Sequence, residues 1–248
     1  MIKLPLIFIV GIIAGFINTN AGGGSLLTLP ALIFMGLPSA IANGTNRIAI
    51  LVGAISATRS FKSKGIFDWK FGLEIAIPAL IGAIIGANIV ISLPDKMFNL
   101  ILSCVMVLVV IVILVNPRNR IKKTGGDLSK GRKIISAILF FFVGFYGGFI
   151  QAGVGFLIIT TLAFTTRLSL VRINALKVFV VFIYTIFSLG VFVLKGKIDL
   201  PIGLTLAAGS AIGSHLGCNF AVTKGDKWIR VILIIAVIAM ALKLAGVF

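Results

Sequence analysis

The stretch that decides the fold runs from Gly15 to Leu26 and reads GFINTNAGGGSL. A related stretch from Gly148 to Leu157 reads GFIQAGVGFL. Each places glycines and amide side chains inside long apolar sequence. An unwound, polar backbone costs free energy within a membrane, so it persists where it lines a cavity. Paired breaks of this kind are typical of transport sites. We call residues 18–25 break 1 and residues 151–155 break 2.

The composition is that of a membrane protein. Of the 248 residues, 59% are hydrophobic and 12% are charged, and the mean hydropathy is +1.20. A soluble domain of this length could not bury so many apolar side chains. The first apolar run begins beside Lys3 and lacks a small-residue cleavage pattern. We therefore expect a first membrane segment there rather than a removed signal peptide.

The formal net charge of +17 arises mostly from Lys and Arg residues in short loops between apolar runs. Cytoplasmic loops of membrane proteins collect such residues, so the charge predicts chain orientation in a lipid bilayer rather than a nucleic-acid partner. The same residues would also attract anionic lipid headgroups or an anionic substrate.

No motif for enzymatic chemistry is present in the sequence. Cys104 and Cys218 both lie in apolar runs, which indicates neither a disulfide nor a metal site. A Walker motif, a metal-spaced His/Cys set and a nucleophile–base arrangement are all missing. We expect no catalytic residues, no cofactor, no metal and no direct use of ATP by this chain.

The second half repeats much of the first at an offset of 131 residues. Between positions 64 and 96 there are 12 identities with their partners and no gap. Shared Gly, Asn, Asp and Lys in the same order are not expected from chance matching of apolar sequence. We predict two homologous halves, 1–116 and 134–248, joined by a basic, mobile cytoplasmic linker at 117–133. The matched pairs include Lys64 and Lys195, Gly72 and Gly203, Gly86 and Gly217, Asn88 and Asn219, and Asp95 and Asp226.

Each half contains five apolar segments, so the predicted fold is an all-α membrane protein with 8–10 transmembrane segments. The segments cover roughly 4–18, 23–36, 47–60, 71–92 and 97–115, then 134–150, 155–166, 175–194, 200–222 and 229–247. The second segment of each half is too short for a bilayer core of about 30 Å, which indicates a half-helix or re-entrant piece. If all ten segments cross and the amino terminus lies outside, the inside loops hold 17 of the 23 Lys and Arg residues. We favour this arrangement, in which five crossings make the halves inverted repeats, over parallel halves.

Both breaks offer candidate substrate ligands. Ser25 is expected to cap the helix that follows break 1, whose free N–H groups and positive dipole end favour an anion. The alternative is that the glycines only let helices pack closely. The candidates are Asn18, Asn20, Gly22, Gly23, Gly24 and Ser25 in break 1, and Gln151, Gly153 and Gly155 in break 2.

A second polar cluster opens the third segment of each half. It comprises Asn43, Thr45, Asn46 and Arg47 in the first half, and Asn174 and Lys177 in the second. A cation near the membrane interior is costly and points to function. Arg47 is the sharper candidate because its planar fork suits an anion with several oxygens. The alternative is that both cations reach out to the membrane interface.

His215 is the one histidine of the chain and replaces Ile84 of the other half. It is a candidate for proton coupling, although a lone histidine is more often a packing residue. Asn88 and Asn219 lie in small-residue runs that first indicate helix packing.

With these residues identified, the chain resembles the TauE/SafE family of membrane permeases along its whole length. The resemblance lies in the early GFxN…AGGGS motif at 15–25, in LPAL at 29–32, in ANGTN at 42–46 and in GFIQAGVG at 148–155. It implies a bacterial inner-membrane secondary transporter for small sulfur-containing anions. Sulfite is the first candidate, thiosulfate or organosulfonates are others, and export is the expected direction. An anion channel and a membrane scaffold subunit remain alternatives, and a homo-oligomer is left open.

Overall fold

The computed structural model describes residues 3–20, 22–66, 69–115, 130–166 and 168–223, and every regular element within them is helical. The all-α prediction is therefore confirmed for this part of the chain. The described helices are α1 (Lys3–Asn20), α2 (Ser25–Phe34), α3 (Ser39–Ser63), α4 (Trp69–Val90), α5 (Asp95–Val115), α6 (Lys130–Phe149), α7 (Val154–Thr165), α8 (Leu170–Leu194) and α9 (Leu200–Thr223).

Two helix pairs, α1 with α9 and α4 with α6, pack closely through glycines. Gly15 of α1 lies against the backbone of Ser210 in α9, and Gly11 lies against Leu206. Gly148 of α6 packs in the same way against Ala83 of α4. Contacts advance in the same direction along both partners, so α1 runs parallel to α9. The α6–α4 pair is parallel for the same reason, since Gly144 lies against Ala79.

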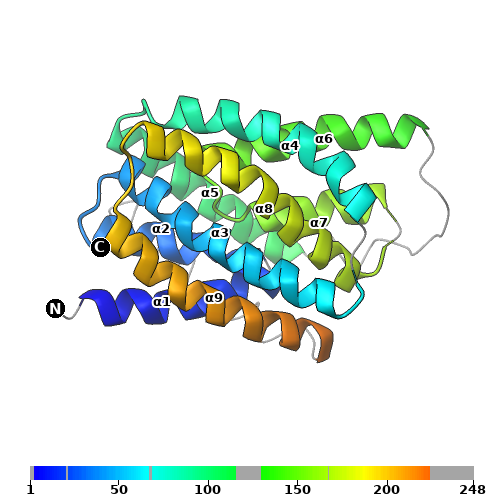
Figure 1. Cartoon of the computed structure of the whole chain (residues 1–248). Coiled ribbons are helices and arrows are strands. Elements are labelled where there is room, and N and C mark those ends of the chain that lie inside the picture. The colour runs from blue at the N-terminus through cyan, green and yellow to red at the C-terminus, as the bar shows by residue number, and fades with distance from the viewer. Residues whose placement is uncertain (1–2, 21, 67–68, 116–129, 167, 224–248) are drawn as a thin grey trace.

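The central helices α3 and α8 contact each other and run in opposite directions (Figure 1). α3 also packs against α9, and α8 packs against α4. α3 therefore contacts the α1–α9 pair, and α8 contacts the α4–α6 pair. α1 begins at the left end of the bundle in Figure 1, and α6 begins at the right end. The first helices of the two halves therefore run in opposite directions.

α2 and α7 are short, as the sequence predicts. They contain 10 and 12 residues. At 1.5 Å per residue they reach about 15 and 18 Å, well below a bilayer core of about 30 Å. Positive φ values at Gly22, Gly153 and Gln151 turn the chain ahead of these helices.

The molecule has an apolar exterior and a partly polar core. Large apolar side chains are exposed at helical spacing along α4, at Ile77, Ile81, Ile85 and Ile89. Within the described residues, two helices are long and apolar enough to cross a membrane, Trp69–Val90 and Val171–Leu194. Shorter apolar helices are Leu4–Asn20, Ser25–Phe34, Ile134–Phe149 and Val154–Thr165. A water-soluble protein buries such side chains, whereas a lipid-exposed surface does not need to.

Two boundaries differ from the prediction. α3 begins at Ser39 rather than near residue 47, because the polar residues before Arg47 are buried inside the bundle and continue the helix. α6 begins at Lys130, inside the predicted linker. Residues 117–129 of that linker and the predicted tenth segment at 229–247 lie outside the described residues.

Candidate functional site

The two breaks meet in the structure. The amide of Gly155 donates to the carbonyl oxygen of Gly22 over 3.3 Å. A Cβ atom on Gly155 would lie 2.2 Å from the Cα atom of Gly22, and one on Gly22 would lie 2.3 Å from the Cα atom of Gly155. No larger residue fits at either position without moving a backbone. The glycines that the sequence singles out therefore bring the two halves of the chain into contact.

Arg47 of α3 is fully buried and binds the end of α6. Its Nη1 atom donates to the carbonyl oxygen of Gly147 over 3.2 Å, and its Nη2 atom donates to that of Gly148. Nη1 also donates to the side-chain oxygens of Gln151 and Ser188, at 3.0 and 2.9 Å. All these acceptors are neutral oxygens, so they solvate the guanidinium without cancelling its charge.

Nearby groups of the first half complete this contact. Asn43, one turn before Arg47, accepts from Nη2 and donates from its amide nitrogen to the carbonyl oxygen of Phe149 over 2.8 Å. The Arg47 guanidinium also lies 4.6 Å from the ring centre of Phe192, a favourable cation–π contact. The last carbonyl groups of α6 are thereby satisfied by side chains of α3.

Lys177 of α8 makes the matching contact with the end of α1. Its ammonium group donates to the carbonyl oxygens of Asn18 and Thr19 over 3.0 and 2.8 Å, and to the side-chain oxygen of Asn174 over 3.1 Å. Lys177 has an exposed fraction of 1%. The alternative that these cations reach out to the membrane interface is therefore wrong for both Arg47 and Lys177.

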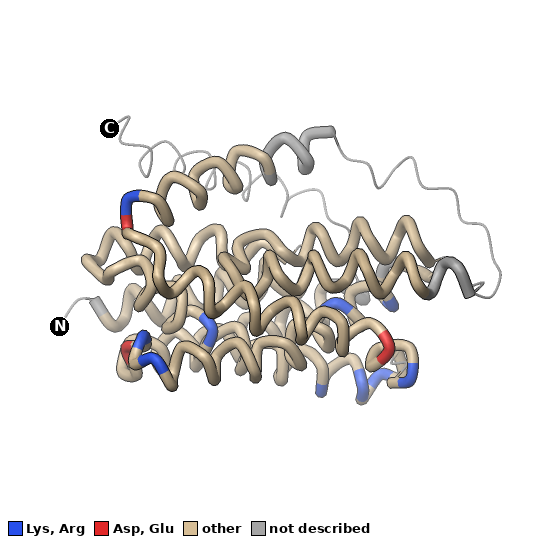
Figure 2. The backbone as a smooth tube through the Cα atoms, turned by 90° about the horizontal axis from the view of Figure 1, so that it is seen from above, with Lys and Arg blue, Asp and Glu red and all other residues tan. Residues whose placement is uncertain are grey.

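The two contacts are reciprocal. A cation on α3 binds the carbonyl end of α6, and a cation on α8 binds the carbonyl end of α1. Helix carboxyl ends carry unsatisfied carbonyls and partial negative charge, so a cation there is stabilised. Figure 2 shows most Lys and Arg residues at the two ends of the bundle, with further blue segments within its length.

Break 1 borders a small cavity of about 10 Å³. Its lining includes Gly24 and Ser25 at the start of α2, Asn46 of α3 and Ser210 of α9. The side-chain oxygen of Asn46 accepts from Thr28, but its amide nitrogen is buried with no acceptor among the described residues. A cavity of this size holds about one water molecule. An unpartnered donor therefore lies beside the amino end of a helix.

The expected helix cap at Ser25 is wrong. The N-cap of α2 is Gly24, which makes no side-chain capping bond, and Ser25 is the first helical residue. Because Ser25 already has helical geometry, its hydroxyl does not occupy the cap position that the prediction required.

Break 2 is filled by its own side chains. The side-chain oxygen of Gln151 accepts from Arg47, and its amide nitrogen donates to the hydroxyl of Thr185 over 3.1 Å. The following Val154 is buried and apolar. The two breaks thus differ: break 1 leaves a polar cavity, and Gln151 is already engaged at break 2.

The remaining candidates lie at different places. The hydroxyl of Thr45 accepts from the backbone amide of Asp199, away from the breaks. The amide group of Asn20 donates to Phe16 of its own helix. His215 lies on the exposed face of α9 between the exposed Ile212 and Leu216, which places it on the outer surface of the bundle.

The sequence reasoning missed several residues of this region. Thr28, Thr185, Ser188 and Phe192 all contact the named polar groups. Each lies inside an apolar helix and carries no motif. The one available signal was the spacing of Thr185 and Ser188, which lie one turn apart on the helix that carries Lys177 and therefore share a face.

A sequence profile described as "Sulfite exporter TauE/SafE" matches residues 7–244. The chain belongs to the TauE/SafE family. It is 31% identical to a "Probable membrane transporter protein" of Haemophilus influenzae, covering 97% of this chain and 94% of that protein. It is 28% identical to "Probable membrane transporter protein ORF9" of Sinorhizobium, with coverage of 97% and 92%. The Escherichia coli protein YfcA, also named a probable membrane transporter, is 30% identical, with coverage of 97% and 89%.

The TauE/SafE match identifies the chain as a multi-pass membrane protein of transporter type and not an enzyme. No solved structure matches it. The names of its relatives specify neither sulfite nor a direction of transport.

Proposed function

We propose that the chain is a secondary transporter that exports small sulfur oxyanions across the cytoplasmic membrane, with sulfite as the first candidate. Thiosulfate and organosulfonates present the same kind of oxygen-bearing anionic group. The observation that carries the proposal is the buried charge of Arg47, which contacts Gln151 of break 2, the break whose Gly155 meets Gly22 of break 1. A buried charge whose acceptors are all neutral creates a positive potential that favours an anion.

Two donors support an oxyanion in particular. Arg47 Nε and the Asn46 amide nitrogen are buried without acceptors in the described part of the chain. Leaving a buried donor unsatisfied costs about 1–3 kcal/mol, so a ligand oxygen at either group would be stabilised. The amino end of α2 adds a favourable dipole on the same side of break 1.

The arrangement of helices supports transport by alternating access between two inverted halves, 1–116 and 134–248. α1 and α6 run in opposite directions, as do α3 and α8 (Figure 1). Arg47 of the first half binds α6 of the second, and Lys177 of the second half binds α1 of the first. The cavity of about 10 Å³ is too small for an oxyanion. Binding at break 1 therefore requires the helices to move apart, as a rocking motion of the halves would achieve.

The test is uptake of radiolabelled sulfite by vesicles that contain the purified protein. We expect saturable uptake with counter-transport, and its loss in Arg47→Gln and Gly23→Leu variants that still insert in the membrane. Normal transport by both variants would contradict the proposed site. Flux that stays linear at high sulfite without counter-transport would indicate a channel instead.

A binding assay that does not need flux identifies the ligand class. A ligand that binds only the folded state raises the unfolding temperature of the purified protein. We expect sulfite, thiosulfate or the organosulfonate taurine to do so, and sulfate and acetate at equal ionic strength to have smaller effects. Stabilisation by carboxylates alone would move the substrate class away from sulfur anions.

A further inference from the structure

The interface between α3 and α9 carries two buried hydroxyl groups that belong to neither break. Ser210 and Ser214 lie one turn apart on α9, with exposed fractions of 6% and 2%. Both face Gly53 of α3, because a Cβ atom on Gly53 would lie 2.5 Å from the hydroxyl oxygen of Ser210 and 2.8 Å from that of Ser214. Two hydroxyl groups are therefore directed at one point where α3 has no side chain.

These hydroxyl groups adjoin the small cavity at break 1. Ser210 lines that cavity together with Asn46, which lies two turns before Gly53 on α3. Asn46 has an exposed fraction of 1%, and its amide nitrogen has no acceptor among the described residues. An unpartnered donor, the amino end of α2 and a hydroxyl group therefore meet at one cavity. All three can donate a hydrogen bond to an oxygen atom.

A positive charge lies at the edge of the same cavity. The ammonium group of Lys177 donates to the carbonyl oxygen of Asn18 over 3.0 Å, and Asn18 is one of the residues that line the cavity. The described lining contains no carboxylate. A surrounding that is rich in donors and carries positive charge attracts an anion and repels a cation.

The matched interface between α8 and α4 lacks these hydroxyl groups. With the offset of 131 residues, Tyr184 stands in place of Gly53, and Ala79 and Ala83 stand in place of the two serines. The side chain of Tyr184 is fully buried and lies in one hydrophobic cluster with both alanines. A ring and methyl groups therefore fill the place where the α3–α9 interface brings hydroxyl groups together.

Close packing alone does not explain the two serines, because the matched interface packs with alanines. The hydroxyl of Ser214 donates to the carbonyl oxygen of Gly15 over 3.3 Å, which is longer than a typical hydroxyl hydrogen bond of about 2.7 Å. A charged oxygen is a stronger acceptor than a carbonyl group. The hydroxyl of Ser214 would therefore bind an oxyanion in preference to Gly15.

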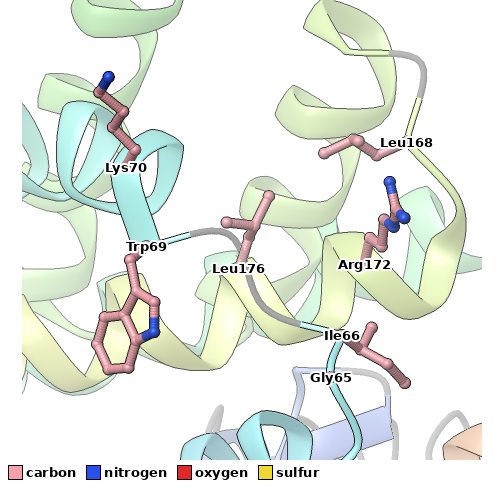
Figure 3. A pocket seen from close by; sticks show the side chains of 7 residues that line it. All are labelled: Gly65, Ile66, Trp69, Lys70, Leu168, Arg172 and Leu176. Carbon is pink, nitrogen blue, oxygen red and sulfur yellow. The ribbon is translucent and has the colours of Figure 1, made fainter.

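The large cavity beside Leu176 is a site of a different kind. Its volume is about 510 Å³, and Lys70 and Arg172 lie on either side of Leu176 (Figure 3). Both cations are exposed. None of the buried polar atoms that lack a partner among the described residues belongs to its lining. The buried donors therefore favour the α3–α9 interface over this cavity as the place that binds an oxyanion.

We propose that the oxyanion binds at a single site between α3 and α9. Asn46 and the amino end of α2 hold one of its oxygens, and the hydroxyls of Ser210 and Ser214 hold the others. The inference rests on the proposed function for its ligand, a small sulfur oxyanion, and names the groups that contact it. The cavity of about 10 Å³ holds little more than one oxygen atom, so α9 moves away from Gly53 as the anion enters. The α4–α8 interface stays packed.

Calorimetric titration of the purified protein with sulfite tests the two serines. Replacing serine by alanine removes a hydroxyl and keeps the packing. We expect Ser210→Ala/Ser214→Ala to weaken sulfite binding at least tenfold and to keep the unfolding temperature measured without sulfite. Ser56→Ala is the matched control, because its hydroxyl lies in the same interface but donates to the carbonyl oxygen of Ala211. A double variant that binds sulfite normally but unfolds at a lower temperature would show that the serines only pack, and the inference would be wrong.

Alkylation tests the opening of the interface without any anion. Ser210 and Ser103 of α5 are almost equally buried, with exposed fractions of 6% and 7%. In a Cys104→Ser/Cys218→Ser background, we expect iodoacetamide to alkylate the Ser210→Cys variant in vesicles at least tenfold faster than the Ser103→Cys variant. The reason is that α9 moves away from α3, whereas the surroundings of Ser103 stay packed. Equal rates for the two variants would overturn the inference.

Transport separates this inference from the proposed function. If the unaltered protein takes up neither sulfite nor thiosulfate nor taurine, the proposed function is wrong, while the alkylation rates still report whether the α3–α9 interface opens. If the unaltered protein takes up sulfite and Ser210→Ala/Ser214→Ala leaves the KM unchanged, the site between α3 and α9 is wrong and the proposed function stands. We expect a KM for sulfite at least tenfold higher in the double variant than in Ser56→Ala.

Discussion

At the scale of single residues, the most informative group is the guanidinium of Arg47. Arginine stays charged in proteins, and its planar fork lets it bind several carbonyls at once. In this chain it holds Gly147 and Gly148 at the end of α6, and its Nε atom is left without an acceptor. One side chain therefore both holds the two halves together and offers charge to a ligand.

Replacing Arg47 by methionine removes the charge and the hydrogen bonds but keeps a long side chain. The variant leaves several buried carbonyls unsatisfied, and we expect it to lose about 3 kcal/mol of stability. Thermal unfolding in detergent measures the loss. Arg59→Met, at an exposed position of the same helix, should stay close to the unaltered protein. Equal unfolding temperatures for the two variants would show that Arg47 holds nothing together.

Gly155 tests the contact between the breaks. In Gly155→Ala, the added methyl group meets the backbone of Gly22, so we expect a loss of about 1–3 kcal/mol together with loss of transport. Gly190→Ala is the control, because a Cβ atom there meets nothing within 4 Å. In a helix interior this control should be neutral or stabilising. Unfolding temperature and vesicle uptake are measured for both, and a neutral Gly155→Ala would be inconsistent with the contact.

At the scale of elements, the parallel helix pairs α1–α9 and α4–α6 depend on backbone contact. Glycines let the chains approach until carbonyl oxygens meet Cα atoms, as at Gly144 and Ala79 or Gly213 and Ile12. In a membrane, where water does not drive helices together, such close packing is a main source of association. The small-residue runs that the sequence assigned to packing do pack in this way.

Gly144→Val should separate α6 from α4. The new Cβ atom would lie 1.9 Å from the carbonyl oxygen of Ala79, so we expect clear destabilisation in a thermal unfolding assay. Because the clash is with backbone, the second change Ala79→Gly should give no rescue. A double variant with restored stability would mean that the contact is made by side chains.

The sequence predicted the elements better than the contacts between them. The short α2 and α7, the breaks and the buried cations follow from glycine placement and the cost of charge in a membrane. Ser25 as a cap was wrong, since helix ends shift by a residue with local geometry that composition does not determine. The roles of Thr185, Ser188 and Phe192 were not predicted, because they depend on which helices face each other.

At the scale of the whole molecule, the two halves carry different residues at equivalent places. Thr45 and Gly44 contact the α8–α9 turn, whereas Leu176 and Ala175 stand at the matched positions of the second half. A cavity of about 510 Å³ lies beside Leu176, between Lys70 and Arg172. The shared motifs therefore do not make the two halves identical.

The orientation is testable with the matched pair Lys64 and Lys195, which are both exposed and lie in equivalent turns. In intact cells that express a background without native cysteines, Lys195→Cys should react with an impermeant thiol reagent from outside. Lys64→Cys should react only after the cells are permeabilised, because basic loops stay in the cytoplasm. Labelling of both positions on the same side would rule out inverted halves.

Each buried cation binds a helix end of the other half, and this has a consequence for how the protein is made. The carbonyl groups of Asn18 and Thr19 leave the ribosome early, but the ammonium group that satisfies them belongs to Lys177. Until α8 has been synthesised and inserted, these two carbonyl groups lack the ammonium group that they bind in the folded protein. The first half must therefore wait in the membrane, incompletely folded, for the second half to complete it.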